Sequence, residues 1–181
     1  MTIRPGCGLL CRRINSLALL ARPFFLSDEN YMRNELAEIE SRCKAIITET
    51  RGLLNWEWDD YIGAFLAAFS AADAPKIEAV CDKYFISRWD TESMAKIPPS
   101  AMAIAESLGG LRSSQILFVT SPGEFVMTYG AWWPWGDGST ISLRIGMVTN
   151  KVPDLASDEL FQEFSEWFTN PQAAETSVSQ D

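Results

Sequence analysis

The sequence contains no histidine. Histidine is the commonest general base in enzymes and a common metal ligand, and it activates the nucleophile in Ser-His and Cys-His pairs. Without it, catalysis would have to rest on paired carboxylates, on a serine or cysteine beside a lysine, or on a carboxylate-bound metal. Phosphate-binding loops and serine-hydrolase motifs are also missing. These absences favour a protein that is not an enzyme and that uses no cofactor.

Cysteine is sparse, with four residues at positions 7, 11, 43 and 81. This count and spacing match neither a disulfide scaffold nor a zinc site, which usually carries paired C-x2-C elements. Cys7 and Cys11 leave open a weak metal-binding pair. The favoured interpretation is a set of reduced thiols in a cytoplasmic protein.

Basic residues are outnumbered, with 15 against 24 acidic residues and a net charge of −9. Residues 1–31 hold four arginines and two acids, a charge of +2, which leaves −11 for the remainder. A body this acidic is repelled by nucleic acid and by anionic lipid, and it attracts basic protein surfaces. We therefore expect a protein partner with a basic surface and no direct binding of nucleic acid. The alternative is that the charge only maintains solubility.

Long apolar runs are missing as well. The apolar stretch 14–21 spans 8 residues, against the roughly 20 that a membrane-spanning helix needs, so we predict no membrane span. Residues 1–31 are interpreted as a basic extension, or alternatively as an organelle-targeting segment, which is typically rich in arginine and poor in acids. A third possibility is a natural start at Met32. We expect one domain over residues 32–171 and a disordered polar tail over 172–181.

Apolar residues at helical spacing predict a long amphipathic helix from Met32 to about Leu54. A second helix is predicted over residues 55–69, with Asn55 as its cap and acids in its first turn. Further helices are expected over 75–85, 100–108 and 157–168.

The hydrophobic period changes from 3.6 to 2 after Leu111, which predicts strands over 115–120, 125–133 and 140–149. A Pro-Gly turn at residues 121–124 joins the first two strands. The predicted class is α+β, with N-terminal helices packed on a three-stranded antiparallel β-meander that a C-terminal amphipathic helix closes.

The last two strands flank the run Trp132-Trp133-Pro134-Trp135. A loop of three residues, 136–138, would pair Trp133 with Ile141 and place the apolar residues of both strands on one face. A loop of two residues would pair Trp133 with Ser142 instead and divide the apolar residues between the faces. We expect the first register, with Trp133 in the core and Trp132 exposed beside Arg144.

The candidate binding residues are the aromatic and charged residues of this hairpin and of the acidic segment before it. They are Tyr129, Trp132, Trp135, Asp137, Arg144, Trp56, Asp59 and Asp60. The competing interpretation is structural, with the tryptophans filling the core and residues 56–60 starting a helix.

The favoured function is that of an acidic protein-interaction protein. An immunity or antitoxin-type inhibitor, or a chaperone, would cover a basic or apolar surface of its partner. One alternative is a small-ligand-binding domain in which Trp132, Trp135 and Tyr129 stack around Arg144. Another is an enzyme that depends on carboxylates. The oligomeric state is left open.

Overall fold

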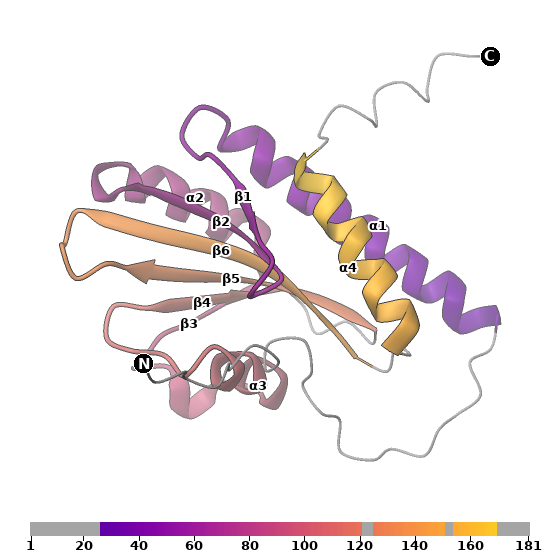
Figure 1. Cartoon of the computed structure of the whole chain (residues 1–181). Coiled ribbons are helices and arrows are strands. Elements are labelled where there is room, and N and C mark those ends of the chain that lie inside the picture. Colours follow the sequence, from indigo (N-terminus) through magenta and orange to yellow (C-terminus); the bar gives the residue numbers. More distant parts are fainter. Residues whose placement is uncertain (1–25, 121–124, 151–153, 170–181) are drawn as a thin grey trace, which may run out of the picture.

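The chain folds around a six-stranded antiparallel sheet with helices on both faces (Figure 1). The computed structural model describes residues 26–120, 125–150 and 154–169. The strands are β1 (Glu57–Asp59), β2 (Ala64–Ser70), β3 (Ser87–Trp89), β4 (Ile116–Val119), β5 (Val126–Pro134) and β6 (Thr140–Thr149), in the order β1-β2-β6-β5-β4-β3. The predicted α+β class is confirmed.

The described residues contain four α-helices, α1 (Leu26–Glu49), α2 (Ala74–Tyr84), α3 (Pro99–Ser107) and α4 (Asp154–Thr169). All four were predicted, although α1 begins before Met32 and ends before Leu54, and α4 begins before residue 157. Short 3-10 turns lie at Ala71–Asp73 and Met94–Lys96. The predicted tail and turn, and residues 1–25 of the predicted extension, lie outside the described residues.

The helix predicted over residues 55–69 is wrong, because this segment forms the hairpin β1–β2. In β2, Phe65, Ala67 and Phe69 are buried on one face, while Ala68 is exposed on the other. Apolar residues spaced four apart are compatible with a helix as well as with a strand. The segment forms a strand because β2 pairs with β6 over its whole length. The Asp59 carboxylate accepts the backbone N–H groups of two turn residues at 3.0 and 3.2 Å, so it stabilises a turn instead of a helix start.

The predicted meander is present as β4–β5–β6, but a sheet of only three strands is wrong. The hairpin β1–β2 adds to β6, and β3 adds to β4. With three residues, β3 is too short to give a clear alternation in the sequence.

The first face of the sheet is covered by α1, α2 and α4, which share one apolar cluster with β2, β5 and β6. An aromatic group lies at its centre, where the ring centroids of Phe65 and Phe168 stack at 3.9 Å. The second face is covered by α3, whose residues Ala101, Ile104 and Ala105 pack on β4 and β5. Both faces of the central strands are therefore buried.

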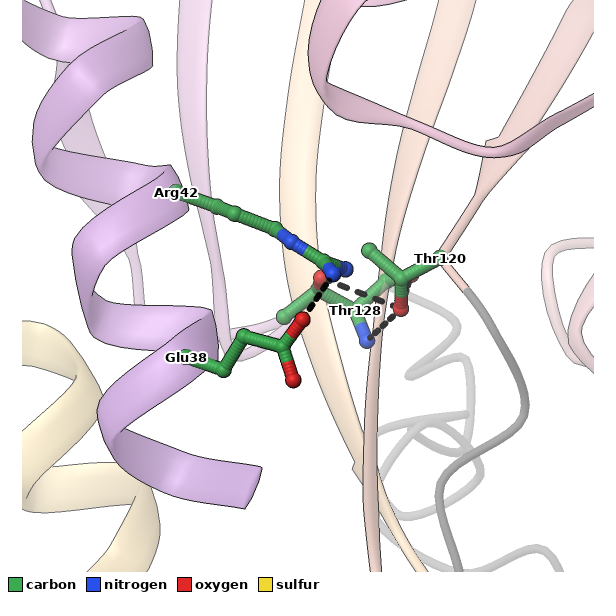
Figure 2. A network of polar contacts seen from close by, with 4 residues as sticks. All are labelled: Glu38, Arg42, Thr120 and Thr128. Carbon is green, nitrogen blue, oxygen red and sulfur yellow. Dashed lines mark hydrogen bonds and ion pairs between the residues drawn. The ribbon is translucent and has the colours of Figure 1, made fainter. Parts of the chain in front are cut away.

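Polar side chains of α1 lie near a pair of threonines at the ends of β4 and β5 (Figure 2). The buried Thr120 hydroxyl donates to the Thr128 carbonyl at 3.2 Å and accepts the Thr128 N–H at 3.1 Å. In Figure 2 the ion-paired side chains of Glu38 and Arg42 extend from α1 toward these threonines. The Glu35 carboxylate accepts the N–H groups of Phe125, just before β5, and of Val126, its first residue, at 3.0 and 3.1 Å, which attaches α1 to β5. We interpret this network as structural, because the two threonines satisfy each other.

Cys43 and Cys81 lie in the first-face core, where burial raises the pKa of each thiol to about 12. A thiol reacts as its thiolate, so both should be inert in the folded protein. In a variant whose other two cysteines are serine, we expect a disulfide reagent at pH 8 to label neither thiol before unfolding and both in urea. Rapid labelling of the native variant would contradict their burial.

Candidate functional site

The register of β5 and β6 pairs Trp133 with Ser142 and Pro134 with Ile141. The predicted pairing of Trp133 with Ile141 is therefore wrong. That prediction rested on the assumption that all apolar residues of the hairpin face a single core, whereas the structure has an apolar core on each face of the sheet. The ladder continues to the tip, where the Trp135 N–H donates to the Thr140 carbonyl at 2.8 Å.

This register reverses the expected roles of two tryptophans. Trp132 is buried on the first face, with its ring edge-on to Phe69 and Phe118 at centroid distances of 5.2 and 6.4 Å. Trp133 is half-buried on the second face. The expectation that Trp132 is exposed beside Arg144 is therefore wrong, and Trp133 takes that place.

Arg144 and Trp133 form the centre of the candidate site. The guanidinium carbon of Arg144 lies 4.3 Å from the ring centroid of Trp133, and Nη1 donates to the Ser142 hydroxyl at 3.1 Å. Arg144 pairs across the sheet with Ala131, whose side chain is small. A cation held on an indole ring is stabilised by about 0.5–2 kcal/mol, depending on exposure. The ring therefore fixes the plane of the guanidinium.

Two buried donors of this centre have no acceptor among the described residues, namely Arg144 Nε and Trp133 Nε1. A buried donor without a partner costs about 1–3 kcal/mol. Burial lowers the pKa of Arg144, and the negative charge of Asp59 opposes that shift. Because arginine titrates so far above neutrality, the group stays charged. The centre is thus a half-buried cation with unused donors.

Tyr129 extends this centre along β5. Its ring lies over Gly146, since a Cβ atom at position 146 would come within 2.3 Å of the tyrosine ring. Only glycine leaves that space, and the ring is buried with 4% exposure. The Tyr129 ring therefore lies directly against β6 at Gly146.

We define the open strip as Trp133, Trp135 and Arg144, with the buried Tyr129 beside it. Tyr129 and Trp133 alternate along β5 on its second face, Trp135 follows the end of β5 at the hairpin tip, and Arg144 lies beside Trp133 on β6. α3 packs on β4 and β5, and on this face no described helix covers β1 or β2 (Figure 1). Trp135, at the hairpin tip, is 52% exposed.

Asp137 holds the tip that carries Trp135. Its carboxylate accepts the N–H groups of Ser139 and Thr140, each at 2.9 Å, and the Thr140 hydroxyl at 2.8 Å. These bonds lower the pKa of Asp137, with the Ser139 N–H contributing most. The loop is expected to be stabilised above the ordinary pKa of 3.8 and to lose that stabilisation as the pH falls through the lower folded value.

We expect an NMR titration to place the Asp137 midpoint below 3.8 and to show that the midpoint rises in Thr140→Val. The variant removes one hydrogen bond to the carboxylate and keeps the shape of the side chain. A wild-type midpoint at or above 3.8 would contradict the bonding at the tip.

The remaining predicted residues are divided between the faces. Trp56 packs edge-on to Phe168 at 5.5 Å in the first-face core and does not reach the open strip. Asp59 lies on β1 and acts on Arg144 electrostatically, and the exposed Asp60 accepts the indole N–H of Trp58 at 2.7 Å. The roles of Trp133 and Ser142 were missed, because the assumed register placed Trp133 in the core.

Comparisons with protein-family models, with curated proteins and with solved structures found no match for this chain. Over the part of the chain that the structure describes, no helix is both long and apolar enough to cross a membrane. Those same residues contain no group of three or more Cys, Asp or Glu side chains arranged to hold a metal ion.

Proposed function

We propose that this chain is a non-enzymatic protein-interaction protein whose partner covers the open strip. The observation that carries the proposal is the alignment of the exposed Trp135 with the half-buried Trp133 and Arg144, next to the part of the second face that α3 covers. Tryptophan, tyrosine and arginine are the residue types that dominate binding hot spots. The rigid tip around Asp137 presents Trp135 at a low entropic cost.

The surroundings of the strip indicate the charge of the partner. The exposed Glu57 and the half-buried Asp59 of β1 lie at the edge of this face, and the exposed Asp137 lies at the hairpin tip. The whole chain carries a net charge of −9. An aromatic strip with an acidic border fits a partner that has a basic border, and such pairs associate faster at low salt. An immunity-type inhibitor or a chaperone meets this description.

Affinity capture with the tagged full chain tests the proposal in extracts of the native host. We expect wild type to retain a basic protein at low salt, identified by mass spectrometry, and to lose it as salt is raised. Trp135→Ser should abolish this capture. Inhibition of the captured protein's activity would favour the inhibitor class, whereas retention of its unfolded form would favour the chaperone class.

Ile86→Ser is the matched control, because Ile86 is 63% exposed and lies beside β3, outside the open strip. It should capture as wild type does. The proposal is wrong if no protein is retained at any salt concentration, or if Trp135→Ser retains the same protein as wild type.

A further inference from the structure

The guanidinium of Arg144 has donors that the described residues do not use. Of its five N–H groups, one on Nη1 is bonded to the Ser142 hydroxyl, and Nε has no acceptor among the described residues but is too deeply buried for a ligand to reach, so the other Nη hydrogens remain for a ligand. Asp59 acts on the group only through its charge, since no described carboxylate forms an ion pair with Arg144. A half-buried cation with unused donors and no ion pair to a described carboxylate is a candidate binding site for an anion.

The geometry around Arg144 favours a planar carboxylate. The Trp133 ring, 4.3 Å away, holds the guanidinium in one plane. An arginine fork held in this way is prepared for two parallel hydrogen bonds to a carboxylate. Leu66 and Ala131 flank Arg144 in the same cross-strand row, so apolar side chains border the cation on both sides.

The charge of the protein limits how much negative charge a ligand can carry. With a net charge of −9, and with Asp59 close enough to act on Arg144, a ligand with several phosphate charges is repelled. A single carboxylate balances the single cation. The half-buried Leu66 and the exposed Ala68 provide an apolar surface for the rest of such a ligand.

We propose that Arg144 anchors the carboxylate of a small organic monoanion on the second face of the sheet. Ser142 and Trp133 orient the guanidinium, and the ligand's apolar body lies over the β2 side of the face. This binding requires no protein partner, so it can succeed or fail independently of the proposed interaction function.

Titration of the full chain with sodium benzoate at constant ionic strength tests the inference, with the tryptophan indole N–H signals followed by NMR. Trp133→Phe identifies the Trp133 signal. We expect that signal to shift saturably by about 10 mM benzoate, a concentration that fills roughly nine-tenths of a site with a Kd of 1 mM. Sodium chloride at the same concentrations should not reproduce the shift.

Substitutions separate a specific site from a general charge effect. Arg144→Met should abolish the shift, and Arg144→Lys should weaken binding about tenfold because lysine lacks the planar fork. The exposed Arg112 gives the matched control Arg112→Met, which should bind as wild type does. If Arg144→Met disturbs the other indole signals, Arg144→Lys provides the decisive comparison, because it keeps the charge.

The inference is overturned if benzoate produces no saturable shift of the Trp133 signal, or if both Arg144 variants bind as wild type does. Inorganic phosphate is the second probe and should bind more weakly than benzoate. Equal or tighter binding of phosphate would overturn the choice of a monocarboxylate.

Discussion

Trp132→Ala is expected to lower the free energy of unfolding by about 3–5 kcal/mol, the range for removing a large aromatic side chain from a core. Trp132 is 4% exposed and packs between Phe69 and Phe118, so its loss leaves a cavity under the first-face helices. Urea unfolding followed by circular dichroism measures the difference.

Trp135→Ala is the internal control for this measurement, because the same substitution three residues away removes a half-exposed ring. We expect it to change the stability by less than about 0.5 kcal/mol, as is usual for surface positions. Equal effects of the two substitutions would mean that the register of β5 and β6 is wrong.

Phe164→Ala is the second substitution with a large expected effect, again about 3–5 kcal/mol. Phe164 is fully buried on α4 and contacts the rings of Phe65 on β2 and Trp58 on β1 at centroid distances of 5.8 and 6.2 Å. Its loss removes edge-to-face contacts that attach α4 to the sheet.

The neighbouring Glu163→Ala changes an exposed residue of the same helix and should stay within about 0.5 kcal/mol of wild type. Urea unfolding of the two variants side by side provides the test. A small effect of Phe164→Ala would show that α4 contributes little to the core.

The helices could be predicted from the sequence where apolar residues recur at helical spacing over a long segment. In α1, buried Leu36, Ile39, Cys43, Ile46 and Ile47 recur at helical spacing, and the i,i+4 pair of Lys44 and Glu40 supports the helix at 2.6 Å. The hairpin β1–β2 was not predictable in this way. Its apolar residues fit both periods, and the pairing with β6 that decides between them involves residues about 80 positions away.

The candidate site was predictable in its residue types more than in its arrangement. Arg144, Tyr129 and Trp135 were identified because aromatic residues and arginine in a hairpin are typical of binding surfaces. Trp133 was missed because its face depends on whether one or both sides of the sheet are covered. The two alanines of α3 that cover the second face, Ala101 and Ala105, give only a weak apolar signal in the sequence.

The most direct test of the open strip is the affinity of the captured partner for the wild type and for Trp135→Ala, measured by calorimetry at low salt. A hot-spot residue contributes 2 kcal/mol or more, so we expect Trp135→Ala to bind at least about 30-fold more weakly. The control Ile86→Ala should bind as wild type does. Equal affinity of the wild type and Trp135→Ala would contradict the assignment of the open strip as the interface.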